Sequence, residues 1–135
     1  MVSNAEYIAG NCNIGSAEIA QRRRIGFIAL AILGVGFLIY MFGVFSLNFS
    51  PLLGILFIFP STIAAIGFIQ ARQKFCAAYG FSSVTNVSVH LGATMKIEDE
   101  IERRKDRNKA IIITLQSIFI GAVVTIVITI LGFII

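Results

Sequence analysis

The sequence contains little charge, no tryptophan and a single histidine. Charged residues make up 13% of the 135 positions and apolar residues 57%, whereas about a quarter of a typical globular domain is charged. In so small a chain, the apolar runs are too long to be buried inside one soluble core. The composition therefore excludes a soluble domain and predicts a protein of the lipid bilayer.

The chain also lacks the short motifs that mark common catalytic and metal sites. It has no glycine-rich phosphate loop, no GxSxG, no HExxH and no CxxC, and one histidine cannot supply a His pair within one chain. No Asp, Glu, Lys, Arg or His lies inside an apolar run, although proton relays and ion-coupled transporters use ionisable groups at that depth. We therefore expect a protein that is not an enzyme, and no cofactor is indicated.

Three apolar segments are long enough to cross a bilayer as helices. Residues 25–47 would extend about 34 Å as a helix, and the hydrocarbon core is about 30 Å thick. Residues 52–70 form a second span, which we expect to continue as a helix to about residue 79, before Gly80. Residues 110–135 form the third. The expected fold class is an all-α integral membrane protein with three transmembrane helices.

Two connecting segments lie on either side of the first span. Residues 1–24 form an N-terminal arm, in which Asn13 or Ser16 is expected to cap a helix that runs directly into the span. Residues 48–51 leave room only for a tight turn between antiparallel helices. The first two spans are therefore expected to form a helical hairpin.

Residues 71–109 form the one sizeable polar loop. The alternating pattern that ends the stretch 81–91 suits a short strand. Thr94 is then expected to cap a charged helix over residues 95–109, which runs on without a break into the third span. The loop is therefore predicted to be a short extended segment followed by a helical stalk.

Few polar side chains occur inside the spans. Pro60 removes one backbone hydrogen bond and predicts a kink over residues 56–60, with Ser61 or Thr62 able to bond a freed backbone group. The other intramembrane polar groups are expected to form hydrogen bonds between helices; they are Tyr40, Gln116 and Ser117.

Charge is distributed asymmetrically along the chain. All 11 Lys and Arg residues lie before the first span or between the second and third. The positive-inside rule therefore places the N-terminus in the cytoplasm and the C-terminus outside, in a cell or inner membrane. The same rule accounts for the basic clusters, so nucleic acid is not an expected partner. Anionic lipids are expected to contact the basic residues nearest the membrane, namely Arg22, Arg23, Arg24, Arg72, Lys74, Arg107 and Lys109.

Small residues recur at helical spacing in two of the spans. Such residues let helix backbones approach closely, so these stripes predict packing between helices. The pattern leaves open whether the stripes pack on each other or on another protein. The predicted packing residues are Gly26, Ala29, Gly36 and Gly43 in the first span and Ser117, Gly121, Thr125 and Thr129 in the third.

One set of residues carries metal-binding chemistry. Cys12, Cys76 and His90 all lie in cytoplasmic segments and together offer ligands for zinc or copper. Their spacing matches no known metal motif. Cys76 also fits a small buried apolar residue, and Cys12 a lipidation site.

Two functions are compatible with these features. The first is a small non-enzymatic accessory or assembly subunit that packs against larger membrane-protein subunits. The second is a homo-oligomeric channel or metal-ion transporter with Cys12, Cys76 and His90 at its cytoplasmic face. A thiol redox function is a third alternative, which requires the two cysteine sulfurs to meet.

Overall fold

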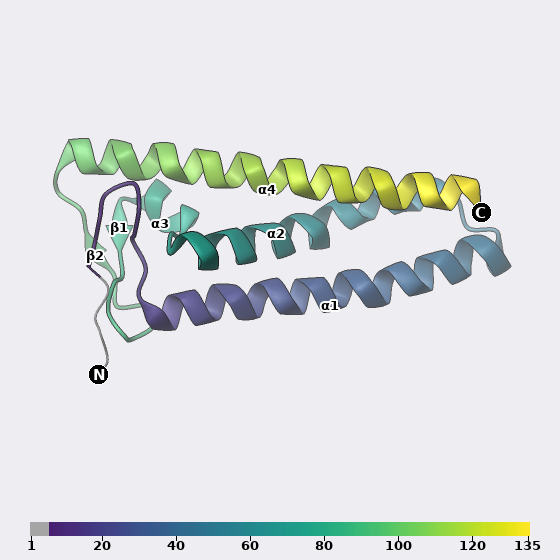
Figure 1. The fold of residues 1–135 in the computed structure, drawn as a ribbon, viewed down its shortest axis with the longest axis horizontal. Helices are drawn as coiled ribbons and strands as arrows, with labels where there is room; N and C mark the ends of the chain where they lie inside the picture. Colours follow the sequence, from purple (N-terminus) through teal and green to yellow (C-terminus); the bar gives the residue numbers. More distant parts are fainter. Residues whose placement is uncertain (1–5) are drawn as a thin grey trace.

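A computed structural model describes residues 6–135 as long helices lying side by side, with the polar segments gathered at one end (Figure 1). The first five residues of the predicted arm lie outside the described residues. Three helical segments are long and apolar enough to cross a membrane, namely Ser16–Leu47, Pro51–Gln73 and Glu100–Ile134. The prediction of a multi-pass, mostly helical membrane protein is therefore confirmed.

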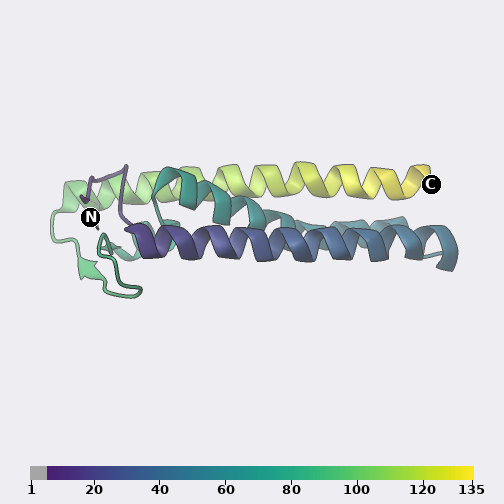
Figure 2. The same ribbon diagram turned by 60° about the horizontal axis from the view of Figure 1, so that its bottom comes forward.

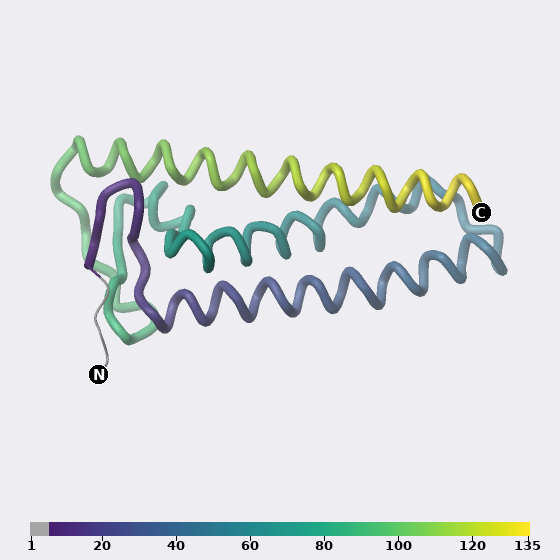
Figure 3. Tube along the Cα trace, viewed as in Figure 1, coloured from purple at the N-terminus to yellow at the C-terminus, as the bar shows by residue number. Residues whose placement is uncertain are grey.

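The second span lies between the other two. The helix α2 (Ile58–Gln73) packs against both α1 (Ser16–Leu47) and α4 (Glu100–Ile134), whereas α1 and α4 make few contacts with each other (Figures 1 and 2). At the far end, the Tyr40 hydroxyl donates a hydrogen bond of 2.7 Å to the carbonyl of Pro51. The trace in Figure 3 places the C-terminus at the opposite end of the helices from the polar segments. The three spans therefore form a row held together by its central member.

The first helix is continuous from the arm into the span, as predicted. Its N-cap residue is Gly15, and neither Asn13 nor Ser16 caps it, because the Asn13 side chain is bonded elsewhere. The helix ends where Asn48 adopts a left-handed conformation with φ 56° and its N–H bonds the Gly43 carbonyl. A tight turn follows, and the second helical segment of the hairpin begins at Pro51.

The second span differs from the prediction at both of its ends. It begins as a 3₁₀ helix, η1 (Pro51–Phe57), and it ends at Gln73 instead of continuing to about residue 79. Residues three apart eclipse in a 3₁₀ helix, so Gly54 and Phe57 are both buried between the flanking helices. The helix stops because Lys74 takes a left-handed conformation with φ 53°.

Pro60 lies in the first turn of α2, next to the change from 3₁₀ to α winding. The Ser61 hydroxyl donates to the carbonyl of Phe57 and also to that of Gly121 in α4. Ser61 therefore bonds the carbonyl four residues before it, not the Leu56 carbonyl that Pro60 leaves free in an α-helix, and it also joins α2 to α4.

The charged helix that ends the polar loop begins later than predicted. A short helix, α3 (Ala77–Ser82), precedes two antiparallel strands, β1 (Val84–Thr85) and β2 (Met95–Lys96). The alternation that ends the stretch 81–91 forms bends and a turn and not a strand, so that prediction is wrong; β1 lies before it. Because residues 95 and 96 pair with β1, the charged helix cannot begin at residue 95. It begins at Glu100, with Asp99 and not Thr94 as its N-cap residue.

Replacing Asp99 by alanine tests this helix start. The Asp99 carboxylate accepts hydrogen bonds from the N–H groups of Ile101, at 2.7 Å, and Glu102, at 3.1 Å. We expect Asp99→Ala to lower the free energy of unfolding by about 1 kcal/mol. Glu98→Ala is the matched control, because Glu98 is exposed and caps nothing. Equal stability of the two variants, measured by SDS unfolding in mixed micelles, would contradict the assignment.

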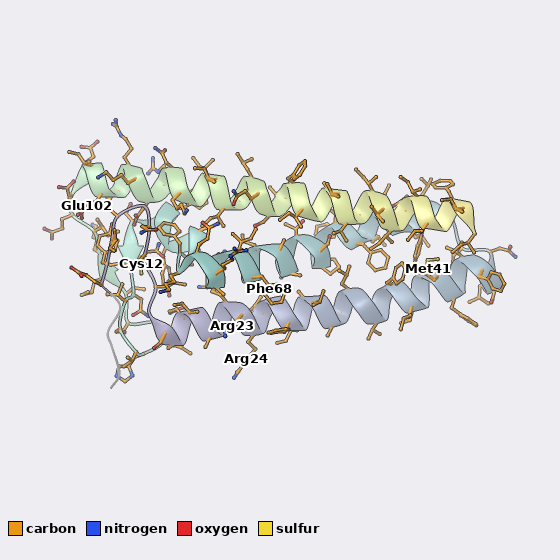
Figure 4. The ribbon with its side chains drawn as sticks, in the orientation of Figure 1. Cys12, Arg23, Arg24, Met41, Phe68 and Glu102 are labelled. Atoms are coloured by element: carbon orange, nitrogen blue, oxygen red, sulfur yellow. The ribbon has the colours of Figure 1, made fainter. Side chains whose placement is uncertain are left out.

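Both small-residue stripes lie against the second span. Gly26 of α1 is so close to Gly67 of α2 that a Cβ on Gly67 would lie 2.7 Å from the Gly26 nitrogen. Gly121 of α4 faces Thr62 in the same close manner, and Phe68 packs beside α1 (Figure 4). The other predicted packing residues are also buried or partly buried; they are Ala29, Gly36, Gly43, Ser117, Thr125 and Thr129. The two stripes therefore meet α2 from opposite sides, and not each other.

Candidate functional site

The polar segments fold together into one unit at the charged end of the helices, which we call the polar cap. It comprises residues 6–15, the first two turns of α1, residues 74–99 and the first two turns of α4 (Figure 1). Three buried polar side chains organise it: Asn13, Glu18 and Asp106 are each at most 1% exposed. Each bonds a segment distant in the sequence.

Asn13 connects the arm to the start of α3. Its side-chain oxygen accepts from the Cys76 N–H at 2.6 Å, and its amide group donates to the Cys76 carbonyl at 3.1 Å. Its backbone carbonyl accepts from the Asn86 N–H at 2.9 Å and from the Thr85 hydroxyl at 3.0 Å. Asn13 therefore holds two separate segments of the chain, one at Cys76 and one at residues 85–86.

Glu18 is the buried charge of the cap. One carboxylate oxygen accepts from the Tyr79 hydroxyl at 2.8 Å, the Asn86 amide at 3.0 Å and the Gly92 N–H at 3.1 Å. The other oxygen lies 3.5 Å from the Arg22 guanidinium. Burial alone would raise the pKa of Glu18, but these hydrogen bonds and the Arg22 charge outweigh it and lower that pKa.

Tyr79 and Arg22, two partners of Glu18, also interact with each other, and the carboxylate changes the pKa of Tyr79. Burial and the hydrogen bond to the carboxylate raise the pKa of Tyr79 to about 12. Its hydroxyl therefore remains a donor at neutral pH. The Arg22 guanidinium also lies over the Tyr79 ring, 5.9 Å from the ring centre. The arrangement holds an ionised carboxylate in place and joins α1, α3 and the loop before β2.

Asp106 connects α4 to the arm. Its carboxylate accepts from the Gly10 N–H at 2.6 Å and from the Tyr7 hydroxyl at 3.1 Å. Burial raises the pKa of Asp106, and the hydrogen bonds from Gly10 and Tyr7 oppose that effect without cancelling it. The pKa of Tyr7 is raised as well, mainly by burial and in second place by the neighbouring Asp106 carboxylate. The carboxylate therefore acts as an anchor for the arm.

The predicted metal ligands take different positions. Cys12 and Cys76 are buried in the cap as free cysteines, whereas His90 is exposed on the loop before β2. Within residues 6–135, no three His, Cys, Asp or Glu side chains are grouped so that they could hold a metal ion. The Cys12 thiol points to the Ile14 carbonyl at 3.7 Å. The structure therefore does not gather this set into a metal site.

Sequence reasoning did not single out Asn13, Asn86 or Asp106 as organising residues of the cap. For Asp106, a signal was present. It lies four residues before Ala110 and eleven before Ser117, so the buried stripe of α4 extends back through it. Asn13 and Asn86 lie in irregular segments, where no periodicity marks a buried position.

A pocket of about 520 Å³ opens between the arm and the ends of α2 and α4. Its wall carries three basic side chains, the Gln73 amide and one carboxylate. The lining residues are Glu6, Ile8, Asn11, Cys12, Arg72, Gln73, Lys74 and Lys109. Three of the seven residues predicted to contact anionic lipid therefore meet at one place, while Arg23 and Arg24 are exposed on α1 and Arg24 points away from the other helices (Figure 4).

An exposed amide interrupts the apolar surface of α4 well inside the third span. Gln116 of α4 is exposed on that surface, and no hydrogen bond from the described part of the chain reaches its amide. It lies seven residues beyond Lys109, or about 10 Å along the helix. By helical spacing it shares a face with Ile120, Val127 and Leu131. A primary amide is therefore exposed among apolar side chains of a candidate span.

An apolar groove of about 400 Å³ lies between α1 and α4. Leu131 and Ile128 of α4 form one wall, and the other wall includes Gly34, at which a Cβ would meet nothing within 4 Å. The remaining lining residues are Leu30, Leu33 and Phe37. The face of α4 that carries Gln116 therefore continues into this groove.

No family model, curated protein or solved structure matches the chain. The class of the protein follows from its own features. Three spans of sufficient length and apolarity, and a polar cap at one end, define a small multi-pass membrane protein.

Proposed function

We propose that the protein is a small non-enzymatic subunit that packs against a larger membrane protein through one face of α4. In this proposal the polar cap faces the cytoplasm and the C-terminus lies on the outer side. The distribution of Lys and Arg supports this orientation, because every one of them lies at the cap end.

The exposed amide of Gln116 is the observation that carries the proposal. An amide that faces hydrocarbon without a partner is costly, because lipid tails cannot form hydrogen bonds. The hydroxyl groups of Ser117 and Thr125 avoid this cost by bonding carbonyls of their own helix. A polar group on a neighbouring transmembrane helix would satisfy Gln116 in the way that intramembrane amides are commonly satisfied.

The groove between α1 and α4 supports the same partner. A helix that meets Gln116 and continues along Ile120, Val127 and Leu131 would reach the groove at its far end. Gly34 leaves open space there, and small residues favour the close approach of another helix. A single transmembrane helix of another subunit could therefore bond the Gln116 amide and also pack into the groove between α1 and α4.

Purification from the native membrane tests the proposal. The tagged protein would be extracted in a mild detergent, its native mass measured, and every co-purifying polypeptide quantified. We expect a larger membrane protein in stoichiometric amount. Because one interhelical hydrogen bond contributes about 0.6 kcal/mol on average and up to about 1.7, Gln116→Leu should weaken the association by about threefold, and by ~20-fold at most.

Ile118→Leu is the matched control, because it places leucine on the opposite flank of the same exposed span. It should leave the co-purifying protein unchanged. A monodisperse monomer without any partner would contradict the proposal. A homo-oligomer that survives Gln116→Leu would contradict it as well, and would favour the channel alternative.

A further inference from the structure

The pocket between the arm and the helix ends has the charge of an anion-binding site. Arg72, Lys74 and Lys109 contribute three positive charges and Glu6 one negative charge, which leaves a net charge of +2 on the wall. Among residues 6–135, the salt bridge that forms joins Arg22 to Glu18 and involves none of these groups. The three cations are therefore available to a ligand.

The pocket also contains an amide without a partner. The side-chain oxygen of Gln73 is buried and has no hydrogen-bond partner in the described chain. A buried polar atom of this kind is rare in folded proteins. Because this oxygen is buried, the NH₂ group is the half of the amide that can reach the pocket and donate to an anionic oxygen.

The backbone of Lys74 gives an independent indication. Its φ of 53° is a left-handed conformation, which glycine adopts freely and other residues adopt at a cost. The Lys74 N–H bonds the Gln70 carbonyl, and the Lys74 carbonyl accepts from the Asn13 N–H at 3.2 Å. Glycine would form both bonds, so the structural role of this position does not require a lysine.

The position of the pocket relative to the membrane indicates where the anion comes from. Arg72 follows the apolar run of the second span directly, and Lys109 immediately precedes that of the third. Both therefore lie at the level of the lipid headgroups, where basic side chains meet phosphate. We propose that this pocket binds the phosphate of an anionic phospholipid headgroup.

Lipid binding to the purified full-length protein tests this proposal. Native mass spectrometry in a neutral detergent would count bound phosphatidylglycerol and phosphatidylcholine, with inorganic phosphate as a competitor. We expect one phosphatidylglycerol per chain in preference to phosphatidylcholine. Lys74→Gly and Lys109→Gln should each weaken its binding about fivefold. Without lipid, Lys74→Gly should unfold at the wild-type temperature or higher, which separates loss of binding from loss of fold.

Arg24→Gln is the matched control, because Arg24 lies at a similar depth but points away from the other helices (Figure 4). It should bind phosphatidylglycerol within twofold of wild type. An equal loss in Arg24→Gln would show general attraction to the membrane surface and overturn the proposal. Equal binding of phosphatidylcholine, or complete competition by millimolar inorganic phosphate, would overturn it too.

Discussion

Glu18→Ala is expected to lower the free energy of unfolding by about 3 kcal/mol, because a buried donor left without its acceptor costs about 1 to 3 kcal/mol. The substitution leaves the Tyr79 hydroxyl, the Asn86 amide and the Gly92 N–H without their common acceptor. It also leaves the Arg22 charge uncompensated beside an apolar segment. The polar cap should then lose its contact between α1 and the loop before β2.

The effect of this substitution should depend on pH. The pKa of Glu18 is lower in the folded protein than its ordinary value of 4.5, so the folded state favours the ionised form. The stabilisation is therefore complete above pH 4.5 and is lost as the pH falls through the folded pKa. The difference in stability between wild type and Glu18→Ala should be largest at neutral pH and decrease in acid.

Thermal unfolding in a neutral detergent, followed from pH 7 to pH 3, measures both effects. Glu98→Ala is the control, because Glu98 is an exposed carboxylate in the same polar cap. It should change stability little at any pH. A Glu18→Ala difference that stays constant across this range would show that the charge of Glu18 contributes nothing to the cap.

Gly67→Ala is expected to destabilise the protein by about 1 to 3 kcal/mol, because it overpacks the contact between α1 and α2. The new Cβ would lie 2.7 Å from the nitrogen and 2.8 Å from the Cα of Gly26, and 2.9 Å from the carbonyl oxygen of Arg22. All three are backbone atoms, which cannot turn aside as a side chain can. The two helices would have to separate.

Gly34→Ala distinguishes this clash from the general effect of alanine in a helix. A Cβ on Gly34 meets nothing within 4 Å, so this variant should be neutral, or more stable by up to about 1 kcal/mol. SDS unfolding in mixed micelles would compare the two variants. Similar behaviour of Gly67→Ala and Gly34→Ala would show that α1 and α2 do not approach as closely as described.

The spans could be predicted because they follow from local composition. The number of spans and the continuous first helix depend on apolar length and on the absence of a helix breaker. The partner of the small-residue stripes could not be predicted. Small residues permit close approach without specifying what approaches, and the complementary positions Gly67 and Gly54 did not stand out in the second span.

The ends of the helices were predicted less well, because tertiary contacts determine them. The second helix stops at Gln73, since the segment that follows is paired with Asn13. The fourth helix starts at Glu100, since residues 95 and 96 pair with β1. Neither contact could be predicted from the residues next to the helix ends. Cys12, Cys76 and His90 were predicted to bind a metal only because their side chains can be metal ligands, and the residue type does not show which side chains lie close together.

The contact between Asp106 and the arm orders events during synthesis. Gly10 and Tyr7 lie 96 and 99 residues before the carboxylate that they bond. The ribosome therefore produces the first two spans and most of the polar loop before the arm can dock. Until then the Gly10 N–H and the Tyr7 hydroxyl lack the acceptor that they have in the folded protein. Completion of the polar cap thus requires the chain to be synthesised through Asp106, just before the third apolar run begins.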